Sequence, residues 1–378
     1  MPRYSIVMPT YNRGQLLRHS LPTALEQSFD DFEVIVSNNC STDETAEILA
    51  EFDDPRLRVV KPDERLSMVD HWEFALSHAT GEWSLLLCDD DALLPNCLAS
   101  LETTIREADD PKLIQYDRLC YVYGDGIRED GNYVEVGSKV RSGVIELDSA
   151  RRLDAVFWRM SIELPKMLNC TVHRSVLDAL KARWGRIFGV WAPDIWVGVK
   201  LLSHVPRYLK TGPLMLWGET MQSYGSGATR DPAHMLRFYK QFPEFEGTLP
   251  LCPYPEILTV NNCIFDTLAR LKQQDPEGLA PYEIDPIRYR TRMLEDVTVY
   301  TDAGHEDYLP HKARLEKDLA EHKRTNRLGH GLRHLSNRAN ALPEKFARAA
   351  AGSRSKGPKK KHRFDNIADA ARYVGTLL

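Results

Sequence analysis

The first ninety residues alternate between short apolar runs and segments with helical spacing, and this alternation limits the fold more than any other feature of the chain. The apolar runs predict four strands, at residues 4–9, 32–37, 57–60 and 83–87. The intervening segments predict three helices, at residues 15–27, 41–49 and 68–78. This order is typical of a doubly wound, mostly parallel α/β sheet.

Two details of the predicted helices follow from single residues. Pro22 lies within the first helix, and proline removes a backbone donor there, so we expect a kink or a division of that helix. Ser41 with Glu44 three residues later fits a capping box, which predicts that the second helix starts at Ser41.

Polar clusters follow three of the predicted strands. They are Pro9 to Arg13, the pair Asn38 and Asn39, and the run Asp89 to Asp91. Because ligands of open parallel sheets bind outside the carboxyl ends of the strands, the sequence predicts one binding site there.

The run Asp89-Asp90-Asp91 has two readings. Three adjacent carboxylates repel one another, so they need either full solvation or a bound cation. An isolated acidic triplet is more often a solvated turn, but this one directly follows the apolar run Leu85 to Leu87. Its position therefore favours Mg²⁺ or Mn²⁺, which prefer oxygen ligands and are often shared with the phosphates of a substrate.

Three strings then carry a resemblance to a known family. SIVMPTYNR, EVIVSNNCSTDET and ATGEWSLLLCDDDALLP resemble the nucleotide-binding half of family 2 glycosyltransferases, and they cover about residues 4–100. The segment from Leu66 to Glu73 resembles the branch that adds sugars to bacterial surface polysaccharides. The resemblance implies a GT-A fold (α/β, Rossmann-like, with a mostly parallel sheet), to which the sequence adds a helical C-terminal extension.

The resemblance also implies roles for individual residues. Asp90 would be the principal metal ligand with Asp91 beside it, for Mn²⁺ or Mg²⁺, and Tyr11 would lie close to the nucleobase. The residues implied in binding the nucleotide sugar are Pro9, Thr10, Tyr11, Asn12, Arg13, Asn38, Asn39 and Asp89.

One residue departs from the family pattern. Asn39 lies where many relatives have an aspartate that accepts a hydrogen bond from uracil. An amide both donates and accepts, whereas a carboxylate only accepts. Uridine, thymidine, cytidine and guanosine diphosphate sugars therefore all stay open as donors.

An inverting transfer also needs a base for the proton of the acceptor hydroxyl. In the family this base is an acidic residue at the start of a helix in the acceptor-binding half, and Asp194 after Pro193 fits that description. The alternative is an acid placed there only by the helix dipole. Glu163 and Glu219 are other candidates for the base. The histidines 71, 173 and 234 lack metal-ligand spacing and are expected to be structural.

The rest of the chain is less regular. The patterns predict strands at 115–123 and 168–172, helices at 176–184 and 194–202, and mainly helices after about residue 238. We expect a nucleotide-sugar half at 1–100, an acceptor half at 101–235, a helical region at 236–350, and a basic linker with a short terminal helix at 351–378. Within the last part, residues 352–362 predict a flexible linker and 365–378 the helix.

Charge is distributed unevenly. The segment from Lys323 to Arg363 holds thirteen Lys or Arg and one acid, Glu344, although the whole chain has a net charge of −5. This basic C-terminal tail is either solvated or in contact with an anionic membrane, where a lipid-linked acceptor would be presented. Nucleic acid is not an expected partner, because no aromatic residues interleave with the tail's charges.

Composition limits the compartment. The seven cysteines are odd in number and form no C-x-x-C pair, which argues against a disulfide framework and against a zinc site. No apolar run approaches the roughly 20 residues of a membrane span. We therefore expect a cytoplasmic protein that contacts the inner face of the plasma membrane, if at all, through its tail.

The expected reaction is an inverting, metal-dependent transfer from a nucleoside diphosphate sugar to a hydroxyl of a free or lipid-linked saccharide, in bacterial polysaccharide synthesis. A sugar nucleotidyltransferase is an alternative, although PTYNRGQ lacks the Gly-rich, Arg- and Lys-bearing signature of that class. A non-catalytic binding or scaffolding protein on a transferase fold is the other, and Asn38-Asn39 keeps it open.

Overall fold

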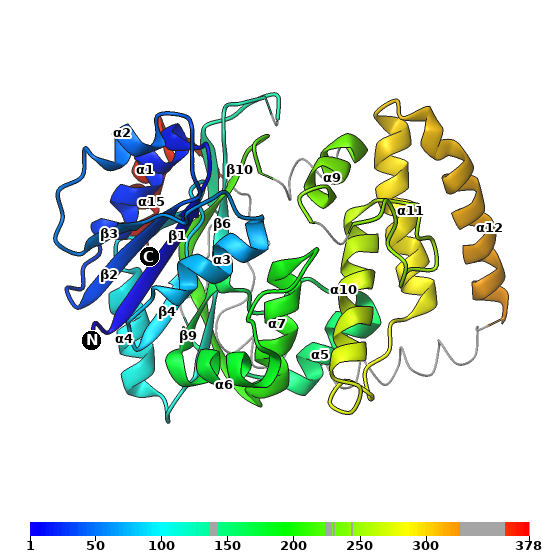
Figure 1. The fold of residues 1–378 in the computed structure, drawn as a ribbon, viewed down its shortest axis with the longest axis horizontal. Coiled ribbons are helices and arrows are strands. Elements are labelled where there is room, and N and C mark those ends of the chain that lie inside the picture. The colour runs from blue at the N-terminus through cyan, green and yellow to red at the C-terminus, as the bar shows by residue number, and fades with distance from the viewer. Residues whose placement is uncertain are drawn as a thin grey trace.

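The computed structural model describes residues 1–126, 128–136, 143–223, 229, 231–242, 245–325 and 360–377. An α/β part holds the sheet, and helices of the C-terminal region lie at its side (Figure 1). The eight strands of the main path follow the order β11-β7-β6-β9-β4-β1-β2-β3. The predicted α/β class with a helical extension is confirmed.

The N-terminal unit is the parallel core of this sheet. Its elements are β1 (Tyr4–Thr10), α1 (Gly14–Leu25), β2 (Phe32–Asn38), α2 (Thr45–Leu49), β3 (Leu57–Val60), α3 (Met68–Ser77) and β4 (Trp83–Leu86). β1 pairs in parallel with β2 and β4, and β2 with β3. All four predicted strands and all three predicted helices are therefore present in the predicted order.

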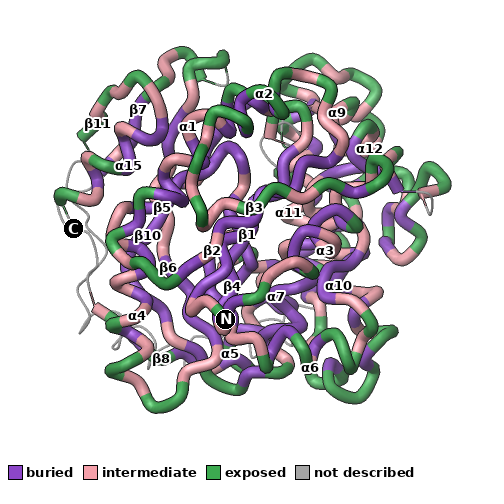
Figure 2. The backbone as a smooth tube through the Cα atoms, turned by 60° about the vertical axis from the view of Figure 1, so that its left-hand side comes forward, coloured by how far each residue is buried: buried purple, intermediate pink, exposed green. Residues whose placement is uncertain are grey.

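Alternate residues of β1 face opposite sides of the sheet, so the sheet separates two apolar cores. Val7 packs with Ile35 and Leu86 in the core shared with α3, α6 and α7. Ile6 and Met8 pack in the core shared with α1 and α4 (Cys97–Glu107). Figure 2 shows these strands as buried backbone at the centre of the molecule.

Two helix predictions need correction. Pro22 does not divide α1, which is one helix from Gly14 to Leu25. α2 begins at Thr45 and not at Ser41, so the predicted capping box is wrong. Ser41 Oγ instead accepts a hydrogen bond from the backbone N–H of Asn12 at 2.9 Å, and Asp43 Oδ1 accepts from the N–H of Thr45 at 3.1 Å. These polar side chains therefore hydrogen-bond to backbone N–H groups around the loop before α2, and they do not form the predicted capping box.

The second half adds strands of both directions to the same sheet. They are β5 (Ala92–Leu93), β6 (Leu113–Val122), β7 (Tyr133–Val136), β8 (Ile145–Asp148), β9 (Cys170–His173) and β10 (Arg207–Glu219). β9 lies antiparallel between β4 and β6, and β10 runs parallel to β6 and antiparallel to β5 and β8. Strands from both sides of residue 100 thus form one sheet.

The predictions for this half are mixed. The strand expected at 115–123 is β6. The strand expected at 168–172 begins only at Cys170, because Met167–Asn169 form a 3-10 turn whose Asn169 Oδ1 accepts from the N–H of Lys166 at 2.7 Å. β10, the longest strand described, was not predicted.

The remaining helices cover the sheet and build the extension. They are α5 (Ser149–Arg159), α6 (Arg174–Trp184), α7 (Pro193–His204), α9 (Pro232–Tyr239), α10 (Val260–Gln274), α11 (Pro286–Asp302) and α12 (Leu309–Thr325). α6 and α7 match the two helices predicted for this half. Among the described residues, none of the helices combines the length and the apolar character that crossing a membrane requires.

The C-terminal segment returns to the α/β part. β11 (Lys360–Arg363) pairs antiparallel with β7, and α15 (Ile367–Gly375) is the predicted terminal helix. Residues 360–362 were expected to belong to a flexible linker, and this is wrong for them, because strand pairing with β7 orders them. The earlier part of the predicted linker, 352–359, lies outside the described residues.

Candidate functional site

The acidic triplet lies between β4 and β5 and is buried. Asp89, Asp90 and Asp91 are 3%, 5% and 5% exposed. Solvation therefore does not separate these carboxylates, so the solvated-turn reading of the sequence does not describe them. Their repulsion must be offset by neighbouring groups or by a bound cation.

One side-chain cation lies against the first two carboxylates. Arg13 donates through Nη1 to Asp89 Oδ1 at 3.0 Å and lies 3.6 Å from Asp90 Oδ2. Thr10 Oγ1 donates to Asp89 Oδ2 at 2.8 Å. Asp91 accepts the backbone N–H of Gly218 at 2.9 Å, so among the described residues two of the carboxylates share one arginine and the third has no ion pair.

The pKa values reflect this incomplete compensation. Burial raises the pKa of Asp90 to about 6, against the opposing effect of Arg13, and the charge of Asp89 raises it further. Burial, followed by the charge of Asp90, raises the pKa of Asp91 well above its usual range. Buried carboxylates of this kind gain stability from a divalent cation.

The donor atoms fit a hard divalent ion. One ligand atom each from Cys88, Asp90 and Asp91 lies within 4.8 Å of the others. Burial raises the pKa of the Cys88 thiol well above its usual range, and sulfur is a soft ligand that hard divalent ions do not prefer. The carboxylate oxygens of Asp90 and Asp91 remain, and they suit Mg²⁺ or Mn²⁺.

Residues far along the chain hold the backbone of the triplet. Tyr123, just after β6, donates its hydroxyl to the carbonyl of Asp90 at 3.1 Å, and Ser20 in α1 donates to the carbonyl of Asp91 at 2.6 Å. A Cβ at Gly218 would lie 1.9 Å from that Asp90 carbonyl, so β10 can approach this closely only with glycine. No local pattern in the sequence indicates these contacts, because the partners lie far from the triplet in the chain.

The two predicted donor loops are joined to each other. Asn12, in the left-handed region at φ 51°, accepts at Oδ1 from the N–H of Thr42 at 2.8 Å. The N–H of Gly14 donates to Asp43 Oδ2 at 3.0 Å. Pro9 is buried within β1 beside Ser37 of β2. The residues that the resemblance assigned to one site therefore do lie at one edge of the sheet.

Tyr11 lies in this loop with a cation against its ring. The guanidinium of Arg65 lies 4.4 Å from the centroid of the Tyr11 ring. The ring is partly exposed, unlike the aspartates. A cation above an aromatic face gives a planar base a stacking surface and an adjacent positive charge.

The departure at Asn39 has a structural reason. Its Nδ2 donates to the carbonyl of Leu66 at 3.0 Å, and its Oδ1 accepts from the N–H of Leu66 at 2.9 Å. A carboxylate could not make the first of these bonds. Asn38 Oδ1 accepts from the N–H of Ser41 at 2.9 Å. Both amides thus hold loop backbone.

Asp194 lies in the first turn of α7, with its side chain 27% exposed. Lys166 Nζ donates to Asp194 Oδ2 at 2.6 Å. Burial opposes ionisation, but the charge and the hydrogen bond of Lys166, the N–H of Ile195 and the charge of Arg118 together hold the pKa of Asp194 below its usual range. Asp194 is therefore an ionised carboxylate able to accept a proton.

The alternative bases are engaged elsewhere. Glu163 lies 3.2 Å from Lys210 Nζ and 3.6 Å from Arg152 Nη1, and Glu219 pairs with Arg128. Among the described residues, none of the three histidines belongs to a group that could hold a metal ion. His71 is buried, bonds Ser37 Oγ at 2.8 Å, and its pKa is lowered to about 4 by burial.

Arg118, in β6, is a further cation that the sequence analysis missed. It is half-buried and lies 5.7 Å from the centroid of the Trp217 ring, next to Gly218. Among the described residues, no acid lies within ion-pair distance of it. Its charge nevertheless lowers the pKa of both Asp91 and Asp194. The sequence signal was the charged pair Asp117 and Arg118 in the middle of a mostly apolar strand.

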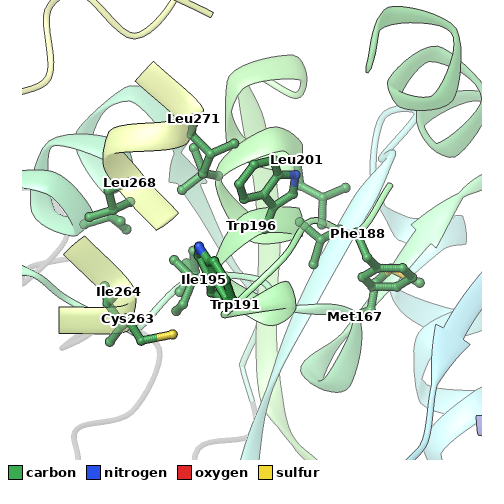
Figure 3. Close-up of a cluster of buried hydrophobic side chains, with 14 of the residues drawn as sticks. Met167, Phe188, Trp191, Ile195, Trp196, Leu201, Cys263, Ile264, Leu268 and Leu271 are labelled. Atoms are coloured by element: carbon green, nitrogen blue, oxygen red, sulfur yellow. The ribbon is translucent and has the colours of Figure 1, made fainter. Parts of the chain in front are cut away.

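The C-terminal helices support the helix that carries Asp194. Figure 3 shows Cys263, Ile264, Leu268 and Leu271 of α10 packed toward Trp191 and Ile195. The guanidinium of Arg270 lies 5.3 Å from the ring centroid of Trp191, which has a left-handed φ of 70°. The extension thus fixes the loop that leads into α7.

Comparison with known proteins bears on this arrangement. Residues 5–129 match the family model described as glycosyl transferase family 2. A GalNAc(5)-diNAcBac-PP-undecaprenol beta-1,3-glucosyltransferase of Campylobacter jejuni is 33% identical over 104 residues, which are 27% of this chain and 34% of that protein. The putative colanic acid biosynthesis glycosyl transferase WcaA of Escherichia coli is 31% identical over 100 residues, 26% of this chain and 36% of WcaA.

These matches are partial. The aligned segment spans about a third of the length of both curated relatives. The solved structure of S. aureus TarS 1-349 in complex with UDP-GlcNAc aligns with 79% of this chain and 81% of that chain, at a TM-score of 0.47 and 14% identity. A likeness at that level adds nothing to the argument.

Proposed function

We propose, from the match of residues 5–129 to the family model described as glycosyl transferase family 2, that the chain transfers a sugar from a nucleoside diphosphate sugar to a saccharide hydroxyl. The buried triplet carries the proposal. Within the described part of the chain, two of its carboxylates share Arg13 and the third has no ion pair, which is the charge imbalance that a divalent cation with a diphosphate offsets.

We assign Asp90 and Asp91 as the residues that hold Mn²⁺ or Mg²⁺, with Asp89 beside them toward the ribose. A bound ion would neutralise charge on the departing nucleoside diphosphate. Arg118 is assigned to the phosphates as a second, permanent positive charge, because the described residues offer it no carboxylate partner and it lies beside the strand that contacts Asp91. Tyr11 provides the stacking surface for the nucleobase.

Asp194 is the proposed base of an inverting transfer. Its carboxylate would take the proton of the acceptor hydroxyl as that oxygen attacks the anomeric carbon and the bond to the diphosphate breaks. Lys166 fixes the orientation of the carboxylate and keeps it ionised. The partial exposure of the side chain allows an acceptor to reach it.

The proposed acceptor is a saccharide, free or lipid-linked, in bacterial surface-polysaccharide synthesis. The names of the relatives support this class: one specifies an undecaprenol-linked substrate and another colanic acid biosynthesis. Contact with an anionic membrane through the basic tail is part of the proposal. Lys361 and Arg363 both pair with Asp130, so cations that precede residue 360 would have to make that contact.

The membrane contact is tested by co-sedimentation with phosphatidylglycerol-containing vesicles, with and without residues 352–378. Binding that salt weakens and truncation removes is expected. Binding that neither treatment changes would rule the contact out.

The transfer itself is tested by the release of free nucleoside diphosphate from UDP-, TDP-, GDP- and CDP-sugars with saccharide acceptors and Mn²⁺. We expect acceptor-dependent release from one donor, and its loss in Asp194→Asn. Nucleotide binding without release from any donor would favour the non-catalytic alternative. Release of pyrophosphate from a nucleoside triphosphate and a sugar phosphate would favour the nucleotidyltransferase.

A further inference from the structure

The C-terminal eighteen residues described in the structure form a unit on the α/β part. Lys360 lies opposite Val136 and Arg363 opposite Tyr133 in the antiparallel pairing of β11 with β7, and the N–H of Phe364 donates to the carbonyl of Asn132 at 2.9 Å. α15 then contacts α1, β5, β7 and β10, and Figure 2 shows β11, β7, α15 and α1 together on one side of the molecule. We call residues 360–377 the C-terminal clasp.

The inner face of α15 is buried in a core of its own. Four clasp side chains, each at most 4% exposed, belong to this core: Ile367, Ala370, Ala371 and Val374. Their buried partners come from the strands, and they are Ala92, Leu94, Tyr121, Val134, Val136 and Leu216. Without the clasp, this apolar surface would face water.

Three of those partners are next to groups that hold the acidic triplet. Ala92 directly follows Asp91 and pairs with Leu216 across β5 and β10. Leu216 is two residues before Gly218, whose N–H donates to Asp91 Oδ1 at 2.9 Å. The clasp therefore packs on both strands that fix the Asp91 carboxylate.

The third partner, Tyr121, is linked to Asp90 through Tyr123. The Tyr121 ring lies edge-on to that of Tyr123, with centroids 4.9 Å apart, and the Tyr123 hydroxyl donates to the carbonyl of Asp90 at 3.1 Å. β5 directly follows the triplet, β10 carries the Gly218 N–H, and Tyr123 directly follows β6, so these three strands connect the triplet to the core that the clasp covers. No clasp residue appears in a hydrogen bond or ion pair with Asp89, Asp90 or Asp91.

We propose that the C-terminal clasp positions the candidate metal ligands, by holding β5, β6 and β10 in the register that presents the carboxylates of Asp90 and Asp91 together. Ile367, Ala371 and Val374 are positioning residues in this account, since they act through the strands. The metal-binding part of the inference rests on the proposed function, and the positional part does not.

The test uses the full chain with Val374→Asp, which places a charge in the buried face of α15. Two readouts are taken: Mn²⁺ affinity from the electron paramagnetic resonance signal of the free ion, and hydrogen exchange at the amides of Asp91 and Gly218. We expect the dissociation constant for Mn²⁺ to rise at least tenfold and both amides to exchange at least tenfold faster. Far-UV circular dichroism and exchange in β1 and β2 should stay as in the wild type.

Two matched variants separate positioning from general damage. Val374→Ile keeps the apolar contact and should leave Mn²⁺ affinity and exchange within twofold of wild type. Arg372→Ala, on the outer side of the same helix, removes the exposed pair with Glu26 and should also stay within twofold. A tenfold loss of Mn²⁺ affinity with Arg372→Ala would contradict positioning through the buried face.

The outcomes distinguish this inference from the proposed function. Unchanged exchange and affinity in Val374→Asp, with exchange in β11 and α15 showing that the clasp has been released, would overturn the inference. If the wild type binds no Mn²⁺ but Val374→Asp still frees the Asp91 and Gly218 amides, the metal assignment fails and the positioning stands. If Val374→Asp frees β1 and β2 as well, the clasp is a general stabilising element, and the inference is again overturned.

Discussion

Arg13 is the residue on which the charge balance of the candidate site depends. It bonds one buried carboxylate and lies close to a second, while the third accepts, from the described residues, only a backbone N–H. Burial raises the pKa of both Asp90 and Asp91, and Arg13 opposes this effect at Asp90 without cancelling it. Three buried carboxylates beside a single arginine lower the stability of the fold unless a bound cation offsets their charge. The charge balance of Arg13 and the three aspartates is therefore the strongest reason to assign a ligand to the site.

The base assignment predicts separate effects on turnover and binding. Asp194→Asn removes the proton acceptor but keeps the shape, so turnover should fall by roughly 10²- to 10⁴-fold while the affinity for nucleoside diphosphate is unchanged. Steady-state kinetics and calorimetry measure the two quantities. Glu163→Gln is the matched control, because Glu163 is another candidate for the base and its side chain, 37% exposed, is also open to solvent. Equal losses in the two variants would remove the assignment.

The pH dependence follows from the groups that face Asp194. Lys166, the Ile195 N–H and Arg118 lower its pKa against the effect of burial. Asp194 is therefore protonated only below the usual pH range of aspartate. The acid limb of kcat/KM that its protonation causes should lie in that acidic range and not near neutral pH. Lys166→Met leaves the burial and removes the largest stabilising charge, so the limb should move to higher pH. A pH profile that does not move would contradict the role of Lys166.

Among the strands, β10 approaches the backbone of the acidic triplet closely, and Gly218 makes this approach possible. Gly218→Ala would place a methyl group against the carbonyl of Asp90 and should displace the triplet. We expect loss of metal-dependent nucleotide binding and a lower free energy of unfolding. Chemical denaturation and calorimetry measure these effects.

Gly185→Ala is the control for that change. Gly185 has a φ of 74° at the end of α6 with nothing near its Cβ position, so alanine costs roughly 1–2 kcal/mol of backbone strain without touching the site. Nucleotide binding should survive it. Equal binding losses in both glycine variants would show that destabilisation alone explains the effect.

The contact between α10 and α7 is the second element-scale feature. Leu268 is fully buried there, so Leu268→Ala should lower the free energy of unfolding by about 2–5 kcal/mol. Leu309→Ala, at a residue 51% exposed, should change it by less than about 0.5 kcal/mol. Denaturant titration of both variants decides this, and equal small effects would mean that the extension is not packed on the acceptor half.

The sequence predicted those elements whose pattern is local. β1 to β4 are short, mainly apolar runs bounded by turn residues, so all four strands and their order were predictable. β10 contains Gly212 and Pro213, with register shifts at that place, and its pairing with β6 supplies the order that its own pattern lacks. β11 is a basic segment that only its partner β7 makes a strand.

The same distinction holds for the candidate site. Asp89 to Asp91 and the loop from Pro9 to Arg13 follow strands and could be predicted from position. Tyr123 and Gly218 could not, because they meet the triplet through β6 and β10, and the bonds that occupy Asn39 come from Leu66 backbone. Contacts between distant residues leave no periodic signal in the sequence.

At the scale of the whole molecule, the candidate site draws on three parts of the chain. The parallel core supplies the triplet and the donor loops, the second half supplies Asp194 and Arg118, and the helical extension packs on the loop before Asp194 (Figures 1 and 3). The clasp adds support from the end of the described chain. Substitutions far from the reacting groups should therefore reduce the function of such a site, and the variants at Leu268 and Val374 test this.

The most direct test of the central claim is a thermal-shift panel of UDP, TDP, GDP, CDP and ADP, each with and without Mn²⁺, on the wild type and on Asp90→Asn. A ligand at 100 times its dissociation constant adds about 2.7 kcal/mol to the apparent stability, which is readily detected. The account predicts stabilisation of the wild type by one nucleoside diphosphate that requires Mn²⁺ and is absent in Asp90→Asn. No shift with any nucleotide, or an equal shift in Asp90→Asn, would contradict it.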